Sequence, residues 1–162
     1  MKLTFAAFII IMLVCGLAPG FARAEDPPIT VADPGSYVAT VARQMQTEGM
    51  QPLRATFAQI ASDSSGRLSP EIEANIVVYE RAIEHRPARL YRLLDDVTLA
   101  DTVRHIYYYH YFGGNAWLFT RFEFVRISDQ RWALSGLSFT SDWRTIALVT
   151  TPGFRASPVA AR

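Results

Sequence analysis

The sequence has almost no cysteine and almost no lysine. Its single cysteine is Cys15, in an N-terminal apolar stretch, and its single lysine is Lys2. The rest of the chain therefore has no thiol for a disulfide, a Cys-ligated metal or thiol catalysis, and no lysine for a Schiff base or a phosphate-binding loop. A nucleophile elbow, metal-ligand spacing and a glycine-rich phosphate loop are also missing. We expect no metal and no other cofactor.

The first 24 residues have the features of a secretory signal peptide. Lys2 precedes an apolar run at residues 3–17, and Ala22-Arg23-Ala24 offers a small-x-small cleavage site. The run is shorter than the roughly 20 residues that a bilayer-spanning helix needs. We therefore expect cleavage after Ala24, a periplasmic or secreted protein, and no stable membrane insertion of the mature chain.

The mature chain would be close to neutral. The full chain has 16 basic and 15 acidic residues, and removal of Lys2 and Arg23 with the signal leaves 14 basic residues against 15 acidic ones. This balance gives no electrostatic footprint for nucleic acid. We expect a linker at residues 25–33, a single domain at 34–148 and a loose C-terminal tail at 149–162.

Three amphipathic helices are predicted in the first half of the chain. The first has Asp33 or Ser36 as its N-cap and ends at Gly49. A second, shorter apolar stripe stops at the polar stretch "SDSSG". The third is the clearest, with Ser69 as N-cap and Pro70 at the first helical position.

The second half is dense in β-branched and aromatic residues, with turn signals at Gly113-Gly114 and Asp129-Gln130. We predict strands near residues 101–112, 115–127 and 131–141. The segment 88–96 could form a fourth strand or extend the third helix. The predicted fold class is therefore α+β, with the N-terminal helices packed on one face of a curved antiparallel sheet of about four strands.

The stretch "HIYYYHYFGG", residues 105–114, is predicted to be one strand of this sheet. His105 and His110 are an odd number of residues apart, so they point to opposite faces and cannot readily share a metal. With Gly113-Gly114 as a two-residue hairpin loop, residue i faces residue 227 − i. The helices should then cover the face that carries Tyr107, Tyr109, Phe122, Phe124, Leu137 and Phe139.

The opposite face of the predicted sheet is too apolar to lie in water, and such a patch usually marks an interface. Arg104 and Glu123 are expected to pair across the ladder on this face. We predict a homodimer through this outer sheet face. Its candidate interface residues are Trp117, Phe119, Trp132, Leu134, Arg104, Arg121 and Glu123.

Amphipathic helices followed by an antiparallel meander that ends in the aromatic strand "RWALSGLSF" resemble the nuclear-transport-factor-2-like and SnoaL-like superfamily, in an exported bacterial form. The resemblance covers about residues 34–142. It implies a cone-shaped α+β domain, dimerisation through the outer sheet face and a pocket between sheet and helices. Isomerase members use a tyrosine with carboxylates in that pocket. No inward acid of this sequence matches them, so no catalytic residue is carried over.

Two functional hypotheses follow. The first is a small non-catalytic domain that self-associates, or binds a partner or a small apolar ligand, through its aromatic sheet. The second is a lyase or isomerase-type enzyme, or an apolar-ligand binder, whose pocket is lined by His105, Tyr107 and Tyr109 as general base and hydrogen-bond donors. We favour the first hypothesis because the sequence offers no matched acid/base pair.

Overall fold

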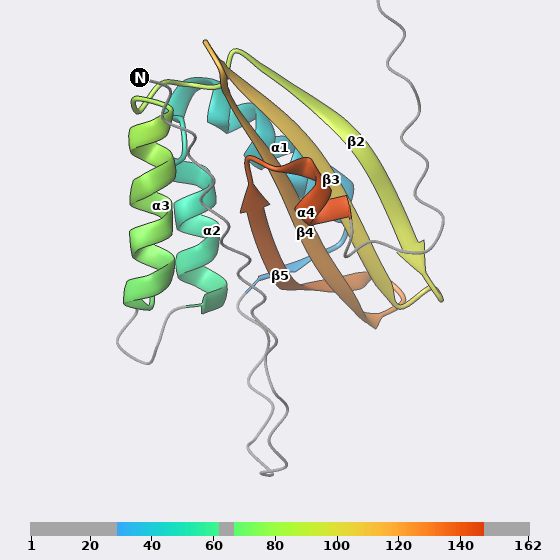
Figure 1. Ribbon diagram of the computed structural model, residues 1–162. Helices are drawn as coiled ribbons and strands as arrows, with labels where there is room; N and C mark the ends of the chain where they lie inside the picture. The colour runs from blue at the N-terminus through green and yellow to red at the C-terminus, as the bar shows by residue number, and fades with distance from the viewer. Residues whose placement is uncertain (1–28, 62–66, 148–162) are drawn as a thin grey trace, which may run out of the picture.

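The computed structural model describes residues 29–61 and 67–147 (Figure 1). The expected signal peptide, the "SDSSG" stretch and the expected C-terminal tail lie outside these residues. None of the helices within the described ranges is long and apolar enough to cross a bilayer. In chain order the elements are β1 (Thr30–Val31), α1 (Pro34–Glu48), α2 (Gln51–Ala61), α3 (Pro70–Ala82), β2 (Leu90–Leu99), β3 (Val103–Gly113), β4 (Ala116–Ser128), β5 (Arg131–Thr140) and α4 (Trp143–Ala147).

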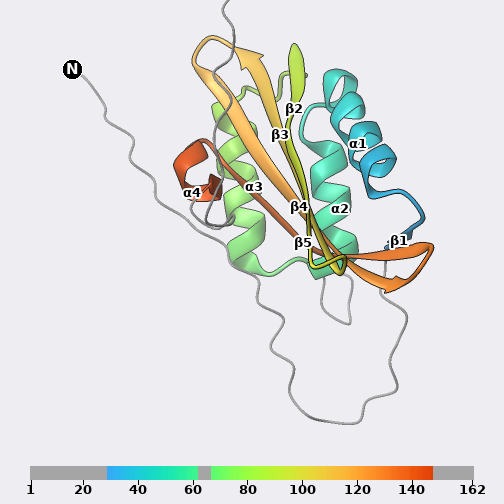
Figure 2. The ribbon, with the colours of Figure 1, turned by 90° about the vertical axis from the view of Figure 1, so that its right-hand side faces the viewer.

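The predicted α+β class is confirmed, with three N-terminal helices packed against an antiparallel sheet. The sheet has five strands in the order β1-β5-β4-β3-β2. We call the sheet face toward α1 the inner face, where Tyr37 of α1 contacts Phe124 with ring centroids 6.1 Å apart. The short helix α4 lies on the other side of the sheet from α1, on the outer face (Figure 2). There Trp143 of α4 packs against Phe119 of β4.

Local capping explains where the helices begin. Asp33 is the N-cap of α1, and its Oδ1 accepts a hydrogen bond from the Gly35 backbone N–H at 3.0 Å. Ser69 caps α3 by accepting from the Ile72 N–H at 3.3 Å. Gly49 ends α1 with a φ of 63°, a conformation that glycine adopts without steric cost.

The segment left undecided between helix and strand is β2, which pairs along its length with β3. Within the expected linker at 25–33, Thr30 and Val31 form β1 and pair with Ala133 and Trp132 of β5. This short strand raises the number of strands from the expected four to five.

The register between β3 and β4 differs by one residue from the prediction. Gly113, not Tyr111, lies opposite Ala116, and Tyr111 lies opposite Trp117. Phe112 has no partner on β4 and forms a β-bulge. Because of this extra residue, the β3 side chains before Phe112 point to the face opposite to the one that a regular hairpin would give them. Tyr107 and Tyr109 therefore lie on the outer face, and the prediction that they face the helices is wrong. The β3 side chains on the inner face are Arg104, Ile106, Tyr108, His110 and Phe112.

With Asp129-Gln130 as a two-residue loop, residue i of β4 was expected opposite residue 259 − i of β5. This register holds at Phe122, which lies opposite Leu137, and at Thr120, which lies opposite Phe139, but not from Phe124 to Arg126. Ser135 forms another bulge, because Glu123 pairs with Gly136 and Phe124 pairs with Leu134, so Ser135 has no partner on β4. The side chains in the N-terminal half of β5 therefore point to the face opposite to the one predicted.

Trp132 and Leu134, expected on the outer face, are consequently buried in the core. The core between the sheet and the helices also contains Val38, Met45, Leu53, Ile76, Phe112, Phe122 and Phe124. Full burial of each such side chain contributes about 1.5–3 kcal/mol. These contacts hold α1, α2 and α3 on the inner face.

Candidate functional site

A cavity of about 770 Å³ opens between α3 and the adjoining ends of β4 and β5. This volume lies in the range of pockets that hold small molecules. Most of its wall is apolar and comes from α2, α3, β4, β5 and the residue that follows α3: Phe57, Val78, Tyr79, Ala82, Ile83, Ala116, Trp117, Leu137 and Phe139. Such a wall favours an apolar ligand over water.

Aromatic contacts fix the wall of this cavity. Phe139 of β5 meets Phe57 and Tyr79 edge to face, with ring centroids 5.4 Å and 4.8 Å apart. The Tyr79 hydroxyl also accepts a hydrogen bond from the Ser141 backbone N–H at 3.0 Å. The helix α3 is thereby held to the end of β5, so the cavity is part of the packed structure.

Two polar side chains on α3 give the cavity its chemistry. Asn75 is only 7% exposed, and its Nδ2 has no hydrogen-bond partner within the described part of the chain. An unpaired buried amide is unfavourable, so a bound acceptor at this position would stabilise it. Arg81 lines the same cavity but is exposed, and its guanidinium makes no hydrogen bond or ion pair with any described residue. The cavity wall is therefore mostly apolar, with the buried Asn75 amide, the exposed Arg81 cation and the neutral polar residues Asn115, Ser138 and Ser141.

Sequence reasoning missed these residues, although one signal was present. Asn75 follows Ile72 by three positions and precedes Tyr79 by four, so it lies within the apolar stripe of α3. A polar residue in such a stripe indicates either a buried hydrogen bond or a functional group. No comparable signal identified Arg81, because charged residues are common on exposed helix faces.

The outer face holds the His105 that was predicted as a general base. The register places His105 opposite Glu123, and His105 Nε2 lies 3.2 Å from Glu123 Oε2. Ser135, the bulged residue of β5, donates from its hydroxyl to the Glu123 backbone carbonyl at 3.1 Å and contacts Oε1 at 3.4 Å. The hydrogen bond from His105, with the nearby Arg121 charge, lowers the pKa of Glu123 despite partial burial.

Tyr107 extends this cluster on the outer face. Its hydroxyl lies 3.4 Å from His105 Nδ1, so both imidazole nitrogens contact protein groups. Tyr107 is 2% exposed, and burial raises its pKa to about 12, although the neighbouring Arg121 acts in the opposite direction. Tyr107 and His105 are therefore largely shielded from solvent, and neither they nor Tyr109 belong to the described residues that line the cavity.

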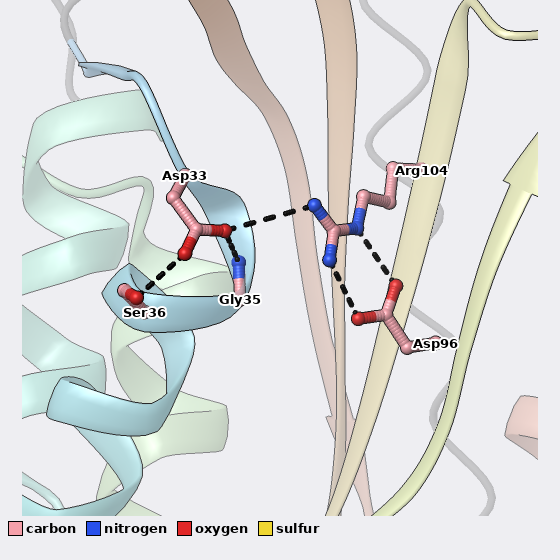
Figure 3. Close-up of polar contacts among 5 residues, drawn as sticks. All are labelled: Asp33, Gly35, Ser36, Asp96 and Arg104. Atoms are coloured by element: carbon pink, nitrogen blue, oxygen red, sulfur yellow. Dashed lines mark hydrogen bonds and ion pairs between the residues drawn. The ribbon is translucent and has the colours of Figure 1, made fainter.

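Arg104 does not pair with Glu123 as predicted, because the changed register turns it to the inner face. It binds Asp96 of β2 in a bidentate ion pair, with its Nε and Nη2 both 2.8 Å from the carboxylate oxygens (Figure 3). Its Nη1 lies 3.7 Å from Asp33 Oδ1 at the start of α1. The hydrogen bonds to Asp96 raise the pKa of Arg104.

The same contacts hold the beginning of α1 against the sheet. Asp33 also accepts a hydrogen bond from the Ser36 hydroxyl at 2.6 Å, the main cause of its lowered pKa (Figure 3). Gly35 lies close by, and a Cβ built there would meet Arg104 Nη2 at 3.3 Å. This cluster is an ion-paired helix cap that joins β2, β3 and α1, and its charges are satisfied within the protein.

The other expected interface residues are dispersed. Trp117 is 40% exposed, lines the cavity and donates from Nε1 to the Ser141 carbonyl at 2.7 Å. Phe119 lies between Tyr109 and Trp143, so α4 covers part of the outer face. The apolar patch expected from the sequence is thus divided between the core, the cavity and the contact with α4.

Comparisons of the chain with protein-family models, with curated proteins and with solved structures give no match. Among the described residues, no group of three or more His, Cys, Asp or Glu side chains is placed to hold a metal ion. The geometry of the chain itself is therefore the basis for the proposals that follow.

Proposed function

We propose that this protein is an exported, non-catalytic binding domain whose cavity takes a long-chain amphiphile with an anionic head group, such as a fatty acid. The observation that carries the proposal is the apolar cavity with the unpaired Asn75 amide in its wall and the unpaired Arg81 guanidinium at its edge. Export is proposed from the signal-peptide features of residues 1–24.

The ligand class follows from the arrangement of apolar and polar groups. An alkyl chain gains about 0.8 kcal/mol for each methylene group removed from water, so the apolar wall favours a long tail. A carboxylate is the natural partner of a free guanidinium, which can bind both oxygens. A neutral ligand would leave Arg81 without a partner, and a small polar ligand would leave the wall in contact with water.

We also propose that the domain belongs to the nuclear-transport-factor-2-like superfamily. Three helices that precede an antiparallel meander, and a cavity between a helix and the sheet, support this assignment. An enzymatic role of His105 and Tyr107 has less support, because both are buried on the outer face, away from the cavity.

Calorimetric titration with palmitate, and with hexadecanol as a neutral ligand of the same chain length, tests this function. We expect palmitate to bind about tenfold more tightly, because only its head group can pair with Arg81. In Arg81→Ala the two ligands should bind alike, whereas Arg43→Ala, an exposed change on α1, should behave as the wild type.

A second variant tests the position of the tail. Val78 is 56% exposed and lines the cavity, so Val78→Trp should narrow the cavity without disturbing the core, and Val78→Ala is its control. Val78→Trp should weaken both ligands. If palmitate binds equally well to the wild type, Arg81→Ala and Val78→Trp, the cavity is not its site and the proposal is wrong.

A further inference from the structure

The outer edge of β2 is a long strand edge that no described strand covers. β2 is ten residues long and ends the sheet, so no described strand pairs with its outer edge. Leu90, Leu93 and Leu94 are 40%, 52% and 40% exposed along it. Natural proteins usually shorten, charge or cover such an edge, because its free N–H and C=O groups invite another strand. A long edge with three exposed leucines therefore offers both backbone groups and apolar side chains to another strand.

A β-bulge gives β2 an unusual side-chain pattern. Arg92 lies opposite Tyr109, and Asp95 lies opposite Tyr107, so both point to the outer face of the sheet. Residues three apart would face opposite sides of a regular strand, but the register shift between Leu93 and Asp95 brings these two to the same side. The pattern on the outer face is thus apolar, positive, negative, apolar, at Leu90, Arg92, Asp95 and Val97.

We propose that β2 pairs antiparallel with β2 of a second copy of this chain, about a two-fold axis between Leu93 and Leu94. This axis places Arg92 opposite Asp95 of the second copy and Leu90 opposite its Val97. Each pair occurs twice by symmetry, so the contact closes as a dimer and does not extend into a fibre. At the axis the exposed Leu93 of each copy meets the exposed Leu94 of the other.

The charges of this seam are available for pairing. The Arg92 side chain makes no hydrogen bond or ion pair with any described residue, and the Asp95 carboxylate accepts only from the Asp96 backbone N–H, at 2.9 Å. In an antiparallel second copy the same pattern runs in the opposite direction, so each charge meets one of the other sign and each apolar residue meets another apolar residue. This match suits a second copy better than an unrelated strand. Pairing at β2 also leaves the cavity beside α3 open, so the dimer is independent of the proposed ligand.

Charge reversal across the seam provides the experiment. The protein is purified in the form in which it accumulates in expressing cells. Its sedimentation velocity is then recorded over a range of protein concentrations. Arg92→Asp and Asp95→Arg each place like charges opposite each other twice, so each should weaken dimerisation by about tenfold or more. The combined Arg92→Asp, Asp95→Arg variant reverses both members of each pair and should restore the wild-type dimer.

Matched variants separate this seam from other surfaces. Arg43→Asp, on α1, should leave the dimer unchanged, and Leu93→Arg at the axis should disrupt it while circular dichroism shows an unchanged fold. A wild type that stays monomeric at all concentrations would overturn the proposal. So would a combined variant that fails to restore the dimer, or a dimer that Trp117→Asp disrupts and Leu93→Arg does not, since the latter would identify the outer face as the interface.

Discussion

His110 should make the stability of this protein depend on pH. Its ring is buried in the core beside Tyr108, its Nε2 lies 3.2 Å from Thr120 Oγ1, and its Nδ1 has no partner within the described residues. Burial lowers the pKa of His110 from 6.5 to about 3, because the charged imidazolium would lose its hydration.

The direction of the effect follows from the two pKa values. Between about pH 6.5 and pH 3 the unfolded chain binds a proton at His110 and the folded chain does not, so stability falls as the pH falls. From about pH 7 to about pH 4.5 this group alone should lower the free energy of unfolding by about 2.5 kcal/mol. Below about pH 3 its contribution should stop changing.

Urea denaturation of the wild type and of His110→Gln at a series of pH values measures this contribution. The glutamine does not titrate and keeps a polar group near Thr120, so its fixed cost appears at every pH. Acidic residues such as Glu123, whose pKa is lowered, also lose stabilisation in acid, but they do so in both proteins. On acidification from about pH 7 to about pH 4.5, the free energy of unfolding of the wild type should therefore fall by about 2.5 kcal/mol more than that of His110→Gln. Parallel pH profiles would refute the reasoning.

Three further changes test the ion pairs by denaturation. Arg104→Leu should cost about 1–3 kcal/mol, because it leaves the partly buried Asp96 carboxylate unpaired; no loss would show that the pair is only incidental. Arg54→Met should destabilise by leaving the buried Glu80, 3.5 Å away, without its cation, and Glu80→Gln in the same chain should recover part of the loss. Glu123→Gln should be less stable than the wild type at neutral pH, and the difference should disappear as the pH falls through the lowered pKa of Glu123; a difference that persists in acid would contradict this.

The candidate site was only partly accessible to sequence reasoning. His105, Tyr107 and Glu123 were singled out individually, but their contact depends on which strand residues lie opposite each other. A one-residue error in that register exchanges the two faces of a strand. The cavity depends on contacts between Phe57, Tyr79 and Phe139, which come from elements far apart in the chain. No local pattern specifies such contacts.

The sequence by itself determined the helices α1, α2 and α3, the strands β3, β4 and β5, and their order. Caps such as Asp33 and Ser69-Pro70, and the alternation of apolar residues around Gly113, are local signals that act over a few residues. Only the tertiary structure decided the bulges at Phe112 and Ser135, and with them which aromatic residues became core and which became surface. The physical reason is that a bulge offers a small local adjustment, while the packing of the whole sheet against α1, α2 and α3 selects the register that buries most apolar surface.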